Sequence, residues 1–191
     1  SELRKRAIHY LRLAGDQSLH SYYTIRAIQA YNDAFELMIE NESGLLEQIQ
    51  MHTRLGDAYF QRGNVDDAWQ EYRRALRIAT NTEQPIEDAN LLDLYDRMGE
   101  LGTRWTGMFN NPPPNLDEVY NYIQEGLQML DDKSLSRSRV TFLTYQTFWY
   151  TRNLQTVTYA RKAELAEQAL SGGHEALRLA EELNDAGALS L

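Results

Sequence analysis

Residues 55–79, LGDAYFQRGNVDDAWQEYRRALRIA, decide the fold because they encode two helices and the turn between them. In the first half, Leu55, Ala58 and Tyr59 recur at the three- and four-residue steps that place side chains on one helix face. Gly56 lies inside this helix, where glycine costs about 1 kcal/mol relative to alanine. The pattern therefore predicts a helix whose glycine allows a partner helix to approach closely.

The second half of the stretch predicts a turn and then the partner helix. Gly63 and Asn64 are residues that end helices. Asp66 and Asp67 follow, and carboxylates stabilise the first turn of a helix because they face its unpaired N–H groups. One stripe of this second helix combines small residues with an aromatic one: Ala68, Tyr72, Ala75, Leu76 and Ala79.

The same pattern occurs earlier in the chain. AIQAYNDAF at 27–35 matches AWQEYRRAL at 68–76 at the alanine, tyrosine and second alanine positions. In both copies a Gly-Asp pair, beginning at Gly15 or Gly56, precedes the first alanine by 12 residues. Recurrence at a fixed period indicates a repeat architecture.

A third copy opens with MGEL at 98–101, and we expect its second helix at 119–127. The three prolines at 112–114 cannot continue a helix, so 110–115 is predicted to be a kinked or interrupted stretch. The last third predicts a helix near 136–152 and one long helix over 156–183. A break of that long helix at Gly172-Gly173 is the competing interpretation.

Composition and charge limit the class of protein. Gly 11 and Pro 4 are few for the turns of an all-β protein, so we expect an all-α chain that is roughly three quarters helical. A net charge of −9 argues against nucleic-acid binding, which needs clustered Lys and Arg. No apolar run approaches the roughly 18 to 20 residues that span a bilayer. With no cysteine, a cytoplasmic protein without membrane segments is expected.

These repeats resemble the tetratricopeptide repeat (TPR), whose 34-residue unit has Leu-Gly-x2-Tyr on its first helix and Ala-x3-Phe/Tyr-x2-Ala on its second. The resemblance implies one TPR-like domain over 1–191, a right-handed superhelical stack (α-α superhelix) of about four helix-turn-helix pairs. The repeats would cover approximately 8–41, 49–82, 92–131 and 136–184. Two departures are His52 in the family's tryptophan position and Thr80 in place of the closing proline.

A narrower resemblance concerns the context of the chain. AIHYLRLAGDQSL, LYDRMGELG and ALRLAEELNDAGALSL are similar to TPR-like regions appended to large bacterial signalling proteins, including class III adenylate or guanylate cyclases and AAA-type ATPase regulators. Because the sequence begins at Ser1 without methionine, we expect it to be a fragment of a larger protein. The resemblance implies a regulatory or sensor region that acts as a scaffold for protein–protein interaction.

No residue pattern predicts an enzyme, a cofactor site or a metal site. Asp16 and His20 are four residues apart, but two ligands do not complete a metal site. His52 replaces an aromatic residue at a helix interface, so we interpret it as a packing residue. The acidic residues lie on helices, with no pair in an apolar run that would raise a pKa for acid–base catalysis. GELGT lacks the features of a phosphate-binding loop.

The residue after the first-helix glycine is acidic in all three readable copies: Asp16, Asp57 and Glu100. In the repeat family this position faces the concave surface, so the resemblance implies a row of carboxylates along a groove. The alternative is a position that is polar in general, in a chain that is acidic throughout. The predicted partner-binding face consists of Asp16, Thr53, Asp57, Phe60, Gln61, Asp96, Glu100 and Arg104.

A helical-repeat stack offers long surfaces without chemistry of its own, so the leading hypothesis is a protein- or peptide-binding module. The carboxylates favour a partner with a basic, extended segment. A homo-oligomer is also compatible with this class. The alternative function is a sensor that binds a small-molecule effector in the groove or at the aromatic helix, which carries Phe142, Tyr145, Phe148, Trp149 and Tyr150.

Overall fold

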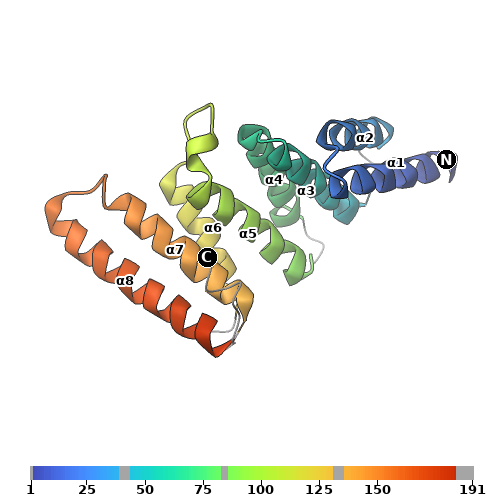
Figure 1. Cartoon of the computed structure of the whole chain (residues 1–191). Helices are drawn as coiled ribbons and strands as arrows, with labels where there is room; N and C mark the ends of the chain where they lie inside the picture. Colours follow the sequence, from blue (N-terminus) through green and yellow to red (C-terminus); the bar gives the residue numbers. More distant parts are fainter. Residues whose placement is uncertain (1, 39–43, 83–85, 131–135, 184–191) are drawn as a thin grey trace. The chain divides into compact units, whose positions relative to one another are not determined.

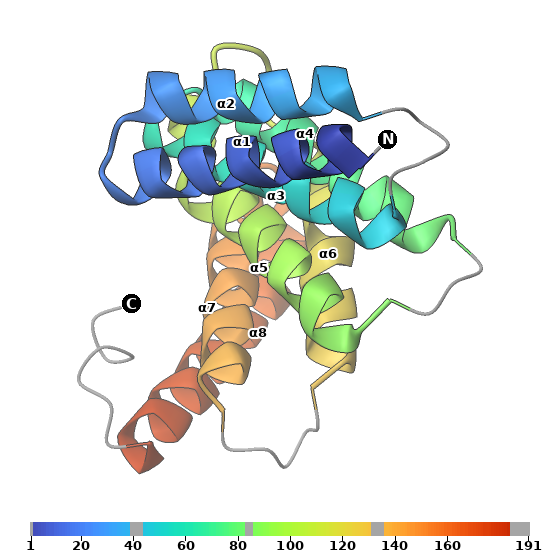
Figure 2. The same cartoon turned by 90° about the vertical axis from the view of Figure 1, so that its right-hand side faces the viewer.

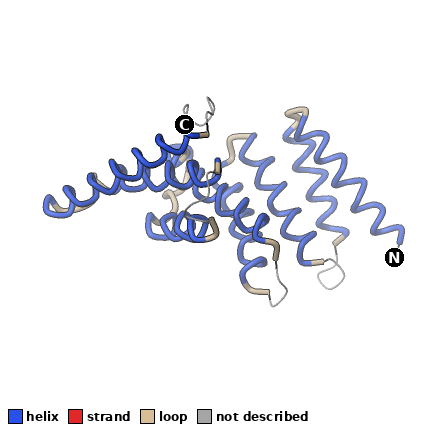
Figure 3. The backbone as a smooth tube through the Cα atoms, turned by 90° about the horizontal axis from the view of Figure 1, so that it is seen from below, coloured by secondary structure: helices blue, strands red, loops and turns tan. Residues whose placement is uncertain are grey.

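The computed structural model describes residues 2–38, 44–82, 86–130 and 136–183 (Figure 1). Helices take up 83% of these residues, and the described part contains no strand (Figure 3). The prediction of an all-α fold is therefore confirmed.

The helices form two compact units. Unit 1 consists of 1–87 together with 108–111, and unit 2 consists of 88–107 and 112–191. The interpretation of 1–191 as a single domain stays a prediction, and each unit is described below by itself.

Unit 1 contains two helix pairs that coincide with the first two predicted repeats. Its helices are α1 Glu2–His20, α2 Thr24–Leu37, α3 Leu45–Gln61 and α4 Val65–Thr80. Helix α1 packs along α2, as Figure 2 shows, α3 packs along α4, and α2 contacts α3. The turn between α3 and α4 passes through Gly63, whose φ of 84° is a conformation that favours glycine, as its position in the sequence predicts.

In each helix pair of unit 1, a tyrosine ring on the second helix packs against a glycine on the first. A Cβ atom added to Gly15 would lie 2.4 Å from the ring of Tyr31, and one added to Gly56 would lie 2.4 Å from the ring of Tyr72. Both rings are almost completely buried. The prediction that these glycines allow the partner helix to approach closely is confirmed, because any side chain at these positions would clash with the tyrosine ring.

Unit 2 contains α5 Asp88–Arg104, α6 Leu116–Gln128, α7 Arg137–Asn153 and α8 Tyr159–Glu182. Helix α5 packs on α6 and α7 packs on α8, while α7 also contacts α5 and α6. Helix α8 runs through Gly172-Gly173 without interruption, so the competing interpretation of a break is wrong. A Cβ atom on Gly172 would lie 3.1 Å from Thr147 Oγ1, so this glycine marks a close approach of α7 rather than a helix end.

A glycine–aromatic contact of the unit 1 kind also occurs in unit 2, between α6 and α7. A Cβ atom on Gly126 would lie 2.2 Å from the ring of Phe142. The two residues are 16 positions apart, the same separation as Gly15 to Tyr31 and Gly56 to Tyr72. Gly126 lies in the segment 119–127, which the sequence predicted only as the second helix of the third copy.

The segment between α5 and α6 includes a short 3-10 helix, η1 Thr106–Met108, and no helix passes through the prolines at 112–114, as predicted. Residues 108–111 belong to unit 1, where the Asp66 carboxylate accepts four hydrogen bonds. The backbone and side-chain nitrogens of Asn110 lie 2.8 and 3.2 Å from its oxygens, and those of Asn111 lie 3.2 and 3.0 Å away. Asp66 thus does more than begin α4, the only role that the sequence predicted for it.

We expect attachment of this segment to depend on pH. Burial raises the pKa of Asp66, but the hydrogen bonds from Asn110 and Asn111 outweigh burial and hold the pKa below its ordinary value of 3.8. A carboxyl group whose pKa is lower in the folded than in the unfolded state stabilises the fold at pH values above its unfolded-state pKa. This stabilisation is lost as the pH falls through the folded-state pKa. The amide NMR signals of Asn110 and Asn111 should therefore shift below about pH 4.

A pair of variants isolates this carboxylate. Asp66→Ala should shift the same amide signals at neutral pH, whereas Asp67→Ala, in the next position, should leave them in place. Unchanged signals in Asp66→Ala would contradict the hydrogen-bonded attachment.

Candidate partner-binding face

The predicted face residues Asp16 and Asp57 are both bound by a tyrosine of their own helix pair. Tyr31 Oη donates to Asp16 Oδ1 at 2.8 Å, and Tyr72 Oη donates to Asp57 Oδ1 at 2.7 Å. Each tyrosine is the residue that covers the glycine immediately before the aspartate. The Gly-Asp pair therefore acts as a unit, in which glycine receives the ring and aspartate receives the hydroxyl group.

The unit 2 counterpart supports this structural role for the acid. Gly126 is followed by Leu127, and the aromatic residue that covers it is Phe142, which has no hydroxyl group. In unit 1 each glycine has both a tyrosine hydroxyl and an aspartate carboxylate beside it, whereas Gly126 has neither group. A buried hydroxyl needs an acceptor, so each aspartate satisfies its tyrosine whatever else it does.

Arg54 adds a second donor to Asp16. Its Nη1 atom lies 2.6 Å from Asp16 Oδ1, and both side chains remain about one-third exposed. Arg54 is absent from the predicted face, because a bond across 38 residues leaves no periodic signal in the sequence.

The charges in unit 1 converge on the Tyr31 hydroxyl. Burial, the hydrogen bond to Asp16 and the negative charges of Asp16 and Asp57 raise the pKa of Tyr31, while Arg54 opposes the shift. Tyr31 therefore remains protonated and keeps its donor at neutral pH. Because both acids influence one hydroxyl group, α1 and α3 bring Asp16 and Asp57 to the same region of unit 1.

The remaining unit 1 members of the predicted face differ in exposure. Thr53 is buried, and its hydroxyl donates to the backbone oxygen of Ile49 at 2.8 Å, within its own helix. Phe60 is half-buried and Gln61 is exposed. Of these three, Phe60 and Gln61 offer surface to a partner, and Thr53 offers little.

Tyr145 is bonded to one of the predicted face residues of unit 2, Asp96, and the charges of the other two act on it. Its hydroxyl donates to Asp96 Oδ1 at 3.1 Å, and its ring lies 2.7 Å from the position of a Cβ atom on Gly99. Burial and the charges of Asp96 and Glu100 raise the pKa of Tyr145, and Arg104 opposes the shift. The charges of Asp96, Glu100 and Arg104 thus all act on one hydroxyl group, and their common partner-binding face stays a prediction.

The arrangement around Tyr145 departs from the repeat pattern in one respect. Tyr145 comes from α7 rather than from α6, the second helix of the pair, where Ile123 occupies the tyrosine position. The acceptor is Asp96, three residues before the glycine, whereas Glu100 after the glycine lies 3.3 Å from Nε1 of Trp105. Whether the acids of the two units form one row stays a prediction.

Asp96 is a half-buried carboxylate whose removal should stabilise the protein. Burial raises the pKa of Asp96, the bond from Tyr145 lowers it, and the charge of Glu100 raises it further, with a net upward shift. An upward shift means that the folded state disfavours the charged form, so ionised Asp96 reduces stability at neutral pH. Asp96→Asn keeps an acceptor for Tyr145 and should raise the urea midpoint at pH 7.

The gain in urea midpoint from Asp96→Asn should depend on pH. It should shrink as the pH falls through the folded-state pKa of Asp96, because the native residue then becomes neutral as well. A lower urea midpoint for Asp96→Asn at pH 7 would mean that the charge of Asp96 is needed for stability.

The aromatic residues of α7 belong largely to the core. Phe142, Tyr145, Trp149 and Tyr150 are buried, whereas Phe148 is 41% exposed. Trp149 Nε1 donates to the backbone oxygen of Leu116 at 2.6 Å. Four of these five aromatic residues therefore offer little surface to a small-molecule effector.

His52 is a packing residue, as predicted. The centroid of its ring lies 4.6 Å from that of the Phe35 ring, and its Nδ1 atom lies 2.7 Å from Oε2 of the buried Glu71. In the described part of the chain, no three His, Asp or Glu side chains are placed to hold a metal ion.

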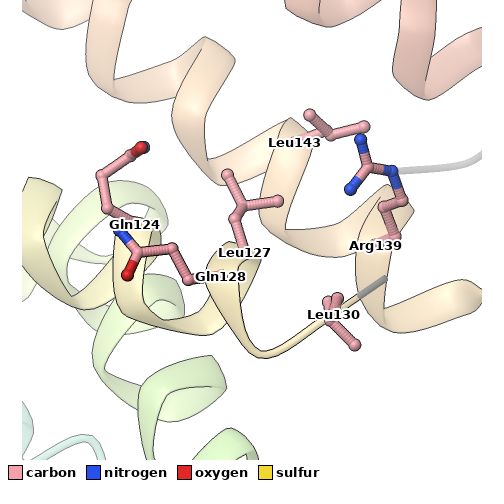
Figure 4. A pocket seen from close by; sticks show the side chains of 6 residues that line it. All are labelled: Gln124, Leu127, Gln128, Leu130, Arg139 and Leu143. Atoms are coloured by element: carbon pink, nitrogen blue, oxygen red, sulfur yellow. The ribbon is translucent and has the colours of Figure 1, made fainter. Parts of the chain in front are cut away.

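Unit 2 also contains a pocket of about 440 Å3 between the end of α6 and the start of α7 (Figure 4). Three leucines, two glutamine amides and a guanidinium group line it: Gln124, Leu127, Gln128, Leu130, Arg139 and Leu143. None of these residues was selected from the sequence, because the pocket arises where two helices meet.

Over the described ranges, none of the helices has the length and apolar character needed to cross a bilayer.

Two comparisons with known proteins found no match. No protein-family model matches the chain, and no curated protein matches its sequence.

Proposed function

We propose that this chain is a non-enzymatic protein- or peptide-interaction module made of TPR-like helix pairs that stack as a superhelix. The observation that carries the proposal is the repetition in unit 1 of the Gly-Asp pair and its tyrosine, with the same 15-residue separation between acid and hydroxyl. Repeated helix pairs present long ridged surfaces and carry no built-in chemistry, so binding is the function that they support best.

The proposed partner contains a basic, extended segment. Asp16 and Asp57 in unit 1, and Glu100 in unit 2, are half-buried carboxylates with some surface remaining. Phe60, also half-buried, offers an apolar anchor beside Asp57. An exposed ion pair contributes only about 0.2 to 1 kcal/mol, so the carboxylates would set orientation and association rate while the aromatic contact supplies more of the affinity.

The proposed context is a regulatory or sensor region of a larger cytoplasmic bacterial signalling protein. This part of the proposal rests on the similarity of AIHYLRLAGDQSL, LYDRMGELG and ALRLAEELNDAGALSL to such regions.

A peptide-display selection on the purified chain tests the function. Selected peptides should be rich in Lys and Arg around an apolar residue, and added salt should weaken their binding without abolishing it. In biosensor kinetics, Asp57→Asn combined with Glu100→Gln should slow association severalfold, with a smaller effect on dissociation.

Tyr72→Phe is the matched control, because it removes the hydroxyl bonded to Asp57 but keeps the charge. It should leave the association rate unchanged. Peptides without basic residues, or equal rates for the native chain and the double variant, would show that the acids serve only the fold.

The pocket between α6 and α7 supports a second candidate function, a small-molecule effector sensor. Its amides and guanidinium group could orient a polar ligand against the leucines. A ligand at 100 times its dissociation constant should add about 2.7 kcal/mol of stability in a thermal-shift panel. Replacing the exposed Gln128 with alanine should reduce the shift, and a panel without any shift would count against this function.

A further inference from the structure

Residues 108–111, Met-Phe-Asn-Asn, form a short segment that belongs to unit 1, although the residues on both sides of it belong to unit 2. Apart from Met108, the last residue of η1, the segment is not helical. Met108 is 42% exposed, and Asn110 and Asn111 are exposed as well. The segment is therefore a surface peptide that contacts with unit 1 hold in place, rather than part of the unit 1 core.

The contacts come from the start of α4 and from the turn before it. The ring of Phe109 lies edge-to-face on the buried Trp69, with 6.1 Å between ring centroids and 78° between ring planes, an arrangement that aromatic pairs favour. A Cβ atom on Gly63 would lie 3.9 Å from Cε of Met108, so this methyl group contacts the turn. Asp66 binds the two asparagines. Every residue of the segment thus has a receiving group on unit 1.

The carboxylate of Asp66 favours two consecutive asparagines. Its Oδ2 atom accepts from the backbone and side-chain nitrogens of Asn110, and its Oδ1 atom accepts from those of Asn111. An ionised carboxylate has about four acceptor positions and no donor, so these four bonds use all of them. An apolar residue would supply only its backbone N–H group, and an acidic residue would add a repelling charge. The contact therefore selects amide side chains.

The first helix pair of unit 1 lacks this carboxylate. The two copies in unit 1 are offset by 41 residues, so Tyr22 corresponds to Gly63 and Ile25 to Asp66. The two turns match in conformation, because Tyr22 and Gly63 both have a positive φ, of 61° and 84°. Ile25 is 64% exposed, and its side chain cannot accept a hydrogen bond. The receiving carboxylate is therefore a feature of α4 and not of the repeat pattern.

We propose that Gly63, Asp66 and Trp69 form a docking site for a short uncharged peptide of a partner protein, with an apolar and an aromatic residue followed by two asparagines. Residues 108–111 are the resident ligand of this α4 docking site. Because a tethered segment acts at an effective concentration of the order of millimolar, it limits access of other peptides to the site. None of the three site residues belongs to the predicted partner-binding face, so the proposal does not rest on the proposed function.

A labelled peptide tests the site on the full chain. The probe is an end-blocked fluorescent peptide with the sequence of residues 106–112, TGMFNNP. Asn110→Ala combined with Asn111→Ala changes only exposed residues and removes two of the four bonds to Asp66, which opens the site. In fluorescence anisotropy, the opened variant should bind the peptide roughly tenfold more tightly than the native chain. Adding Phe109→Ala, which uncovers Trp69, should tighten binding further.

Matched variants identify the contact. In the opened variant, Asp66→Ala should abolish binding, whereas Asp67→Ala, which also removes a carboxylate from the first turn of α4, should leave it unchanged. A peptide with Asn110→Asp and Asn111→Asp should not bind. Circular dichroism should show native helix content in every variant.

Salt separates this site from the proposed function. The probe peptide is uncharged, so added salt should change its affinity little, whereas salt should weaken the binding of basic peptides. Asp57→Asn combined with Glu100→Gln should leave binding of the probe peptide unchanged. If that double variant loses the peptide, the peptide binds the predicted partner-binding face instead.

Several outcomes would overturn the proposal. An opened variant that does not bind the peptide would show that residues 108–111 are only a part of the fold. Equal affinity of the native chain and the opened variant would place the peptide elsewhere. Binding that survives Asp66→Ala would exclude the carboxylate as the receiving group, and equal binding of the aspartate-containing peptide would show that the amides are not recognised.

Discussion

Gly56→Ala is expected to lower the free energy of unfolding by about 2 kcal/mol, although alanine normally favours a helix. The added Cβ atom would lie 2.4 and 2.6 Å from two ring carbons of Tyr72. The ring is buried and its hydroxyl is bonded to Asp57, so it cannot move without disturbing the core or losing that bond. Urea unfolding measures the change.

A helical glycine with space around it is the matched control. A Cβ atom on Gly173 would lie 3.6 Å from Thr147, an ordinary contact, so Gly173→Ala should stabilise the protein by about 0.5 to 1 kcal/mol. Opposite signs for the two alanine substitutions would confirm that the contact with Tyr72 decides the effect.

A double-mutant cycle tests the cause directly. Tyr72→Leu removes the ring carbons that oppose the new methyl group, so Gly56→Ala should cost less in its presence than in the native chain. If the two changes are simply additive, the clash between residue 56 and the Tyr72 ring is not the cause.

Ala68→Leu should destabilise the protein by about 1 to 3 kcal/mol, because it inserts extra carbon atoms where the alanine is fully buried. Ala68 and its counterpart Ala27 have no exposed surface, and Ala68 lies on the helix that packs along α3. The larger side chain must either push α4 away or take a strained rotamer. The urea midpoint and the melting temperature should both fall.

Gln70→Leu provides the control on the same helix. It introduces the same side chain at an exposed position, so its effect should stay within about 0.5 kcal/mol. If Ala68→Leu proves equally mild, the interface between α3 and α4 is loosely packed and the small residues there do not set the helix spacing.

For Asp16 and Asp57, the sequence and the structure reveal different roles. The sequence showed that Asp16 and Asp57 occupy equivalent positions, which suggested a common surface. The structure adds that each accepts a tyrosine hydroxyl, an internal role that the absence of both groups around Gly126 reinforces. Binding and structural roles are compatible, and Tyr72→Phe separates them.

The sequence by itself determined the helices and the contacts within neighbouring pairs. The apolar periodicity, the turn at Gly63 and the prolines at 112–114 depend on local backbone preferences, which the residues carry with them. The 16-residue spacing from glycine to aromatic is nearly as local, because a short turn returns the second helix directly along the first. Phe142 could have been found from that spacing.

Only the tertiary structure decided which distant groups meet. Asp66 holds Asn110 and Asn111 across 44 and 45 residues, and Tyr145 bonds Asp96 across 49. Such pairs depend on the distance and angle at which helices cross, which the combined packing of many side chains sets. No periodic spacing encodes them, so the role of Asp66, the acceptor of Tyr145 and the pocket between α6 and α7 came from the folded chain alone.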